Sequence, residues 1–389
     1  MLTVHLKNGF FAANGGYEFN LVLVAVALAL VLAGGGRTAS TRPWGCSGTR
    51  QSKLGNGTRN YTRKGVDIMN TKPTGIHHVT AIAGEPQCNL DFYEGVLGLR
   101  LIKRTVNFDD PGTYHLYYGD AVGAPGTAMT FFPWARAPRG RRGAGQVVAT
   151  AFSVARGAVP FWEDRLRENG VSAVERIGRF GEEGLAFEDP DGLLLEILAA
   201  TGADDREGWK DGPVPAENSI KGFAGATLLE RDRRGTEVLL TGALGFRAVG
   251  EDGNRFRYEI GGGGPATVLD IVEDPGAGRG NPVVGTVHHI AFRVPDDETH
   301  LAVREEIAGL GYNVTPVLDR NYFRSIYFRE PGGVLFEIAT DPPGFAVDEP
   351  VEELGTNLKL PPQYESHRTQ LEQTLTPIEL PRFGKGARA

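Results

Sequence analysis

The sequence is poor in cysteine and in runs of one charge. Only Cys46 and Cys88 occur among 389 residues. Two cysteines cannot build a multi-bridge disulfide framework, so we expect a reducing compartment and predict a cytoplasmic protein. The net charge is −7 and no long basic run occurs. Nucleic acid is therefore excluded as the expected partner.

Long hydrophobic runs are also scarce. The run LVLVAVALALVLA at 21–33 is the most apolar stretch, and it is shorter than the roughly 20 residues that a membrane span needs. It has the length of a signal-peptide core, but Glu18 precedes it and no small-residue cleavage site follows. Regular patterning begins after Met69. We therefore expect residues 1–69 to be a disordered extension or not part of the native protein, with no membrane partner. A poor signal peptide or membrane anchor is the alternative.

What the chain does contain is a fourfold repeat. Each copy reads as an alternating strand, a helix with i, i+3, i+4 apolar spacing, and three further strands. The pattern predicts an α+β fold of four βαβββ modules. The copies span about 75–134, 146–200, 222–274 and 285–340.

A polar, turn-rich linker at 201–220 separates the second copy from the third. It suggests one two-module domain over 70–205 and another over 206–345. Residues 346–389 then form a C-terminal tail, with a short amphipathic helix near 363–374.

Histidine is used sparingly, yet two of the copies begin with a histidine pair. Eight histidines occur in all, and four of them stand in GIHHVTAIAG and GTVHHIAFRV. Successive strand residues point to opposite faces of a sheet, so only one histidine of each pair can face a given side. His288 shares its face with apolar residues, whereas His289 lies on a mixed face. We therefore predict that His289, and its repeat equivalent His78, face a polar cavity.

A carboxylate completes a ligand set. Glu337 lies in the strand VLFEIAT, where a charge is costly unless it is paired or bound to a metal. Only the first and fourth copies supply the residues of a complete site: His78, His289 and Glu337. Two imidazoles and one carboxylate form the facial triad that leaves three coordination positions open, which suits Fe(II), with Mn(II) as the alternative. Glu196 ends the second copy, but no histidine begins that copy, so we interpret it as solvated or salt-bridged.

Three other histidines, His115, His300 and His367, are interpreted as surface or second-layer groups. The glycines of the turn before Glu337 are interpreted as turn residues only.

Several segments resemble one known family. GIHHVTAIAG, DFYEGVLGLRLIKRTVNFDDPGTYHLYYGD, GTAMTFFPW, VHHIAFRV and REPGGVLFEIATDPPGF are similar to the vicinal oxygen chelate superfamily, which includes glyoxalases, bleomycin-resistance proteins and extradiol dioxygenases. Within it they are most similar to the ring-cleaving hydroquinone and chlorohydroquinone 1,2-dioxygenases. The resemblance covers about 73–375.

The resemblance implies that module pairs form cupped β-sheet barrels and that the three ligand residues hold iron. It also implies catalytic roles for residues around the metal. His288 would lie behind the ligands, Thr80 beside the metal, and Arg320 and Tyr327 along the substrate cavity. His288 or Tyr327 would move protons, and Arg320 would stabilise oxyanions.

The sequence therefore predicts an Fe(II)-dependent extradiol-type dioxygenase that inserts O2 into a hydroquinone-like aromatic diol. A catechol extradiol dioxygenase is one alternative. A glyoxalase-type isomerase or lyase is another, although no matching fourth ligand is found, and a non-catalytic binding module is a third. A homo-oligomer is left open, because modules can pair across subunits in this superfamily.

Overall fold

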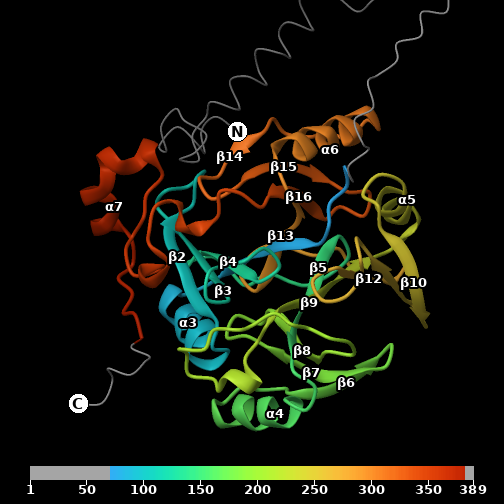
Figure 1. Ribbon diagram of the computed structural model, residues 1–389, viewed down its shortest axis with the longest axis horizontal. Coiled ribbons are helices and arrows are strands. Elements are labelled where there is room, and N and C mark those ends of the chain that lie inside the picture. The colour runs from blue at the N-terminus through green and yellow to red at the C-terminus, as the bar shows by residue number, and fades with distance from the viewer. Residues whose placement is uncertain (1–70, 382–389) are drawn as a thin grey trace, which may run out of the picture. The chain divides into compact units, whose positions relative to one another are not determined.

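The computed structural model describes residues 71–381, which form four βαβββ modules (Figure 1). The predicted α+β fold class is thereby confirmed. The predicted extension at 1–69 lies outside the described residues. No helix within 71–381 is long and apolar enough to cross a membrane.

The first two modules contain these elements: β1 (Ile76–Ala83), α3 (Pro86–Leu90) with the π-helical η3 (Asp91–Val96), β2 (Arg100–Val106), β3 (Tyr114–Gly119) and β4 (Ala128–Pro133), then β5 (Gln146–Val154), α4 (Val159–Glu168), β6 (Glu175–Arg179), β7 (Glu182–Glu188) and β8 (Leu194–Ala199). The last two contain these: β9 (Gly222–Glu230), α5 (Arg234–Gly242), β10 (Arg247–Asp252), β11 (Arg255–Glu259) and β12 (Val268–Glu273), then β13 (Thr286–Val294), α6 (Asp297–Gly309), β14 (Leu318–Asp319), β15 (Arg324–Arg329) and β16 (Leu335–Thr340).

The strands of residues 71–381 form two eight-stranded sheets. One sheet has the order β14-β15-β16-β13-β1-β4-β3-β2, and the other has the order β10-β11-β12-β9-β5-β8-β7-β6. Module one therefore pairs with module four, and module two pairs with module three. Each sheet takes one module from either side of the predicted boundary at 205/206, so that boundary does not separate the two sheets. As a division of the chain into domains it stays a prediction.

Helix α6 shows how local sequence builds a module. The Asp296 side chain accepts a hydrogen bond from the backbone N–H of Thr299 (2.8 Å), which caps the first turn. His300, Val303 and Ile307 follow at helical spacing and are buried. The ring of His300 bonds to the carbonyl of Ile338 on β16 (3.0 Å). This helix thus holds β16 in place, and His300 is a buried second-layer group.

The two central strands of the first sheet, β1 and β13, pair antiparallel with a β-bulge in each. The register skips one residue between Ile76 and His78, so His77 is the extra residue on β1. His288 is the extra residue on β13. A bulge locally re-aims the side chains of a strand. The first histidine of each pair therefore escapes the strict alternation that the sequence analysis assumed.

The second sheet repeats the bulges without the histidines. Its extra residues are Val148 on β5 and Ala224 on β9. Glu196 opposes Ala151 on β5, in the same register as Glu337 opposes its partner on β13. Its carboxylate is buried and paired with Arg179 (Nη1 to Oε1, 3.0 Å). The prediction of a salt-bridged Glu196 agrees with this contact. In the second sheet an arginine is thus the partner of the carboxylate, where the first sheet has two histidines.

The segment after β16 packs over module one. Lys103 on β2 is fully buried, and its Nζ atom contacts carboxylate oxygens of Asp348 (2.7 Å) and Glu349 (2.6 Å). The hydroxyl of Tyr364 donates to the carbonyl of Phe108 (2.9 Å). Helix α7 (Arg368–Thr374) lies where the short tail helix is predicted. These contacts fix the β2–β3 loop, which borders the cavity described below.

A pair of buried carboxyl groups lies between modules three and four. Thr236 Oγ1 lies 2.8 Å from Glu230 and 2.5 Å from Glu330. One hydroxyl proton can serve only one of two carboxylates, and backbone N–H groups of Gly332 and Val334 already bond Glu330. Glu230 is therefore the neutral partner. Burial, and next the charge of Glu330, raise the pKa of Glu230 to about 8.

This raised pKa predicts a loss of stability with rising pH. A carboxyl group whose pKa is higher in the folded state stabilises the fold fully below its unfolded pKa, and that contribution disappears as pH rises through the folded pKa. We expect the free energy of unfolding to fall by on the order of 2 kcal/mol between pH 5 and pH 8. Glu230→Gln should remove most of this slope in urea titrations, and Glu217→Gln, on an exposed site, should leave it unchanged. An unaltered slope in Glu230→Gln would contradict the assignment.

Candidate metal centre

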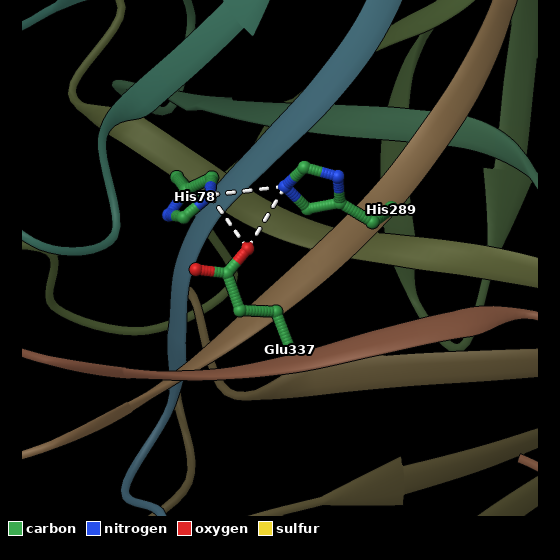
Figure 2. A group of neighbouring side chains, drawn as sticks. All are labelled: His78, His289 and Glu337. Carbon is green, nitrogen blue, oxygen red and sulfur yellow. Dashed lines mark hydrogen bonds and ion pairs between the residues drawn. The ribbon is translucent and has the colours of Figure 1, made fainter. Parts of the chain in front are cut away.

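His78 on β1, His289 on β13 and Glu337 on β16 converge in the first sheet (Figure 2). All three side chains are buried, and their ligand atoms lie within 4.8 Å of one another. Glu337 Oε2 is 2.9 Å from Nε2 of His289 and 3.3 Å from Nε2 of His78. The two Nε2 atoms are 3.3 Å apart. Within residues 71–381 no other cluster of His, Cys, Asp or Glu has this geometry.

Each of these histidines is oriented by the histidine that precedes it. The Nδ1 atoms of His77 and His78 are 2.9 Å apart, and those of His288 and His289 are 2.8 Å apart. If the Nδ1 atoms of His78 and His289 carry the proton and donate to their neighbours, both Nε2 atoms present lone pairs to the centre. Hydrogen-bonded outer groups of this kind fix the tautomer and ring orientation of metal-binding histidines.

The carboxylate of Glu337 is held ionised. The hydroxyl of Ser325 donates a hydrogen bond to its Oε1 atom. Burial raises its pKa, but a proton on His78 or His289 supplies the positive charge and hydrogen bonds that hold the pKa well below its ordinary value. Burial likewise lowers the pKa of His289, which favours the neutral imidazole that binds metals.

The donor set fits a divalent cation. The Oε2 atom of Glu337 is fully buried, yet no hydrogen bond of acceptable geometry reaches it. The nearest polar atoms are Nε2 of His289 and Nε2 of His78, and both are acceptors when the proton of each ring is on Nδ1. Three acceptor atoms facing one another without a donor are unfavourable unless a cation lies among them. Two imidazoles and one carboxylate match the ligand set of non-haem Fe(II) sites, which keep positions open for other ligands.

A cavity of about 420 Å³ opens onto this centre. Both His78 and His289 line it, as do three of the residues predicted to be catalytic: His288, Arg320 and Tyr327. Its walls are mainly aromatic and include Phe108, Tyr117, Phe132, Trp134 and Phe323. Alternation along β13 would have turned His288 toward the core, and the bulge instead leaves it on the cavity wall.

Arg320 and Tyr327 lie together on the module-four side of the cavity. The Arg320 guanidinium lies 5.4 Å from the centre of the Tyr327 ring and 3.2 Å from a carboxylate oxygen of Asp109, which is exposed. Burial raises the pKa of Tyr327 well above its ordinary value, so its hydroxyl keeps its proton. His288 is exposed toward the cavity, and its partial burial, and next the charge of His289, lower its pKa below the ordinary value, so that ring is neutral at pH 7.

Thr80, the fourth residue predicted to be catalytic, is fully buried and opposes His289 across β1 and β13. It ends a hydrogen-bonded chain that the sequence analysis missed. Its Oγ1 lies 2.7 Å from that of Thr130, which lies 2.9 Å from Nε2 of His115, and Nδ1 of His115 lies 2.8 Å from the Tyr117 hydroxyl. His115 was interpreted as a surface or second-layer group; it is buried, which agrees with the second interpretation, and it also lines the cavity. The alternation in YHLYYG, which puts His115 and Tyr117 on one face, is the signal that could have revealed it.

The family model described as Glyoxalase/Bleomycin resistance protein/Dioxygenase superfamily matches residues 75–197 and 234–338. The chain belongs to this superfamily. The fold and the repeated modules agree with that assignment.

Known relatives define its place more closely. The chain is 54% identical over 312 residues to the "Putative ring-cleaving dioxygenase MhqO" of Bacillus subtilis, a match that covers 80% of this chain and 99% of the relative. It is 38% identical over 307 residues to the chlorohydroquinone/hydroquinone 1,2-dioxygenase of Sphingobium indicum, covering 77% and 95% of the two chains. The protein is thus an enzyme of the ring-cleaving dioxygenase group, as the sequence predicts.

Solved structures agree with the fold. The crystal structure of a "putative dioxygenase" from Bacillus subtilis superposes with a TM-score of 0.77 at 53% identity, covering 80% of this chain and 99% of that chain. Glyoxalase I from Zea mays superposes with a TM-score of 0.51 at 15% identity, covering 69% and 92% of the two chains. The second likeness concerns the fold alone.

Proposed function

We propose that this enzyme is an Fe(II)-dependent, extradiol-type dioxygenase that opens the ring of a hydroquinone-like substrate, with His78, His289 and Glu337 as its metal ligands. The observation that carries the proposal is the convergence of three acceptor atoms at one end of an aromatic-walled cavity. A bound Fe(II) would supply Lewis acidity toward a phenolic oxygen and one-electron chemistry toward O2. Mn(II) is the second candidate for the same ligands.

The chain's own residues position the substrate and control its protons. In the tautomer in which Nδ1 of His288 accepts a hydrogen bond from Nδ1–H of His289, the neutral His288 ring carries its own proton on Nε2 and can donate a hydrogen bond into the cavity. Tyr327 keeps its hydroxyl proton and can donate to a developing oxyanion or return a proton to the opened ring. The positive charge of Arg320 stabilises negative charge that develops on the substrate oxygens.

The aromatic walls favour a planar ring, and the cavity is of the size that small-molecule sites commonly have. Hydroquinone and its substituted forms are the proposed substrates, because a relative that is 38% identical is named for them. Catechol is the alternative within the same chemistry. A glyoxalase-type isomerase is less well supported, since no fourth protein ligand joins the cluster within residues 71–381.

Oxygen consumption tests the proposal. The full chain is loaded with Fe(II) without air, and O2 uptake is followed in parallel with hydroquinone, methylhydroquinone, chlorohydroquinone and catechol. We expect uptake with the hydroquinones in a one-to-one ratio to substrate. O2 uptake with catechol alone would support the proposed metal centre and show that the substrate is a catechol and not a hydroquinone. No uptake with any phenol, in protein that holds one iron per chain, would overturn the dioxygenase proposal.

Replacement of Tyr327 by Phe separates a role in proton control from a role in structure. We expect turnover to fall by about 100-fold, because loss of a general acid or oxyanion donor has effects of this size. Iron content should stay at that of the unaltered enzyme, since Tyr327 supplies no ligand. Measurement of iron by atomic absorption beside the turnover rate checks both points, and a variant that loses its iron would show that the tyrosine acts structurally.

A further inference from the structure

A second cavity of about 350 Å³ adjoins the substrate cavity and takes no part in the proposed reaction. The two cavities share Trp134, His288 and Leu335 on their walls. His288 therefore lies between the proposed reaction site and the second cavity. The lining of the second cavity includes two arginines, Arg279 and Arg329, and, among residues 71–381, no aspartate or glutamate.

Two buried N–H groups on this lining have no hydrogen-bond partner among the described residues. Gln146 is 6% exposed, and its Oε1 accepts the backbone N–H of Gly143 (3.0 Å), which fixes the orientation of the amide. Its Nε2 atom is left without a partner, as is Nε1 of Trp134. A buried donor without an acceptor costs about 1–3 kcal/mol. Both groups are donors only, so a ligand that satisfies them must be an acceptor.

The two arginines supply positive charge, and neither makes an ion pair within residues 71–381. Arg329, at the end of β15, donates from its guanidinium to the carbonyl of Gly333 (2.8 Å) and makes no ion pair within that range. Arg279 makes none there either. Glu230 packs against Gly332, but it is not part of the lining, and its raised pKa leaves it neutral at pH 7. The cavity thus combines two cations and two free donors, with no carboxylate on its lining among the described residues. The ionised Glu330 does not line the cavity, and its carboxylate is already bonded to the backbone N–H groups of Gly332 and Val334.

We propose that this cavity binds the carboxylate of a small organic anion, and that the ring-opened product of the dioxygenase reaction supplies it. Guanidinium and amide donors match a planar carboxylate in geometry and charge. The inference rests on the proposed function for the identity of the anion, but not for the presence of the site.

The chemistry of ring opening explains why the product and not the substrate would enter. Hydroquinone and O2 combine into one product that keeps every atom of both: the bond between a hydroxyl-bearing carbon and its neighbour breaks, and each of these carbons gains one oxygen atom. The ring is oxidised and O2 is reduced. The hydroxyl-bearing carbon becomes a carboxyl group and its neighbour an aldehyde, and the carboxyl group releases a proton to water at pH 7. A neutral substrate thus becomes an anion beside a cationic cavity, which favours its departure from the metal centre.

Direct binding to the metal-free full chain tests the site independently of turnover. Isothermal titration with trans,trans-muconate, an open-chain dicarboxylate, should show binding that weakens about ten-fold or more in the double variant Arg279→Gln/Arg329→Gln, which corresponds to about 1.4 kcal/mol. The control is Arg324→Gln, at the opposite end of β15, where the arginine pairs with Asp297 outside the cavity. It should bind muconate as the unaltered protein does.

Two further probes identify the anion. Binding of 2,5-dihydroxybenzoate in place of muconate, with the same dependence on the arginines, would overturn the assignment of the anion to the ring-opened product, because the carboxylate would then belong to a substituted substrate. Sulfate that binds as tightly as muconate, or a double variant that binds muconate unchanged, would overturn the proposal. In the iron-loaded enzyme, the double variant should raise the inhibition constant of muconate and leave the KM for hydroquinone unchanged. If the dioxygenase proposal fails, the inhibition constant and the KM cannot be measured, but the calorimetric titrations still test the anion site.

Discussion

Replacing His289 by Ala is expected to abolish both iron binding and turnover. The change removes one of three side-chain ligands and leaves Glu337 buried beside a single imidazole. We expect iron content to fall to the level of the metal-free protein and the rate to fall on the order of 10³-fold or more, since loss of a preorganised charge-stabilising group already costs about that much. Glu337→Gln should act in the same way, because an amide does not replace the charge of a carboxylate toward a divalent cation.

The matched control is Glu196→Gln. Glu196 occupies in the second sheet the register position that Glu337 occupies in the first, and the amide can still accept a hydrogen bond from Arg179. Iron content and rate of this variant should stay at the values of the unaltered enzyme. A Glu337→Gln protein with full activity and one iron per chain would rule out the ligand assignment.

Replacing Arg179 by Met is expected to destabilise the protein by about 3 kcal/mol, because the change leaves a buried carboxylate without its cation. The Arg179 side chain is 9% exposed and that of Glu196 is 6% exposed, so water cannot replace the lost charge. Chemical unfolding measured at pH 7 gives the effect. Since the change lies in the second sheet, iron bound per folded chain should not alter.

A double variant tests whether the effect belongs to the ion pair. In Arg179→Met/Glu196→Leu both charges of the pair are gone, and replacement of a buried pair by apolar side chains is often close to neutral. Asp270, which Arg179 also contacts (3.4 Å), keeps Arg255 and Arg257 as partners. We therefore expect the double variant to recover most of the stability that the single variant loses. A single variant as stable as the unaltered protein, or a double variant that is less stable than the single one, would contradict this account.

Much of the fold could be predicted because each module carries its own local pattern. Alternation in the strands, helical spacing in α6 and the glycine turns are short-range signals, and they repeat four times along the chain. The pairing of module one with module four has no such signal. It depends on contacts between residues far apart in the sequence, such as those between Thr80 and His289, and a polar linker at 201–220 suggested a different grouping.

The candidate site, too, was predictable only where the signal is local in the sequence. His78, His289 and Glu337 were identifiable because imidazoles and a carboxylate are unusual in apolar strands. The strand pairing then places Glu337 opposite Ala291, beside the strand of His289. The bulge at His288 was not predictable, because alternation is the only rule that the strand sequence offers. The place of His115 on the cavity wall was not predictable, because a single histidine does not reveal its partners. Its contact with Thr130 comes from another strand of the sheet.

The most direct test of the central claim is the fate of labelled oxygen. Iron-loaded enzyme is mixed with hydroquinone under ¹⁸O2, and the products are analysed by mass spectrometry. The account predicts a ring-opened acid aldehyde that carries both labelled atoms, with none formed by His289→Ala. Unlabelled benzoquinone, with O2 reduced to peroxide or water, would show that the centre oxidises the substrate without opening its ring and would contradict the account.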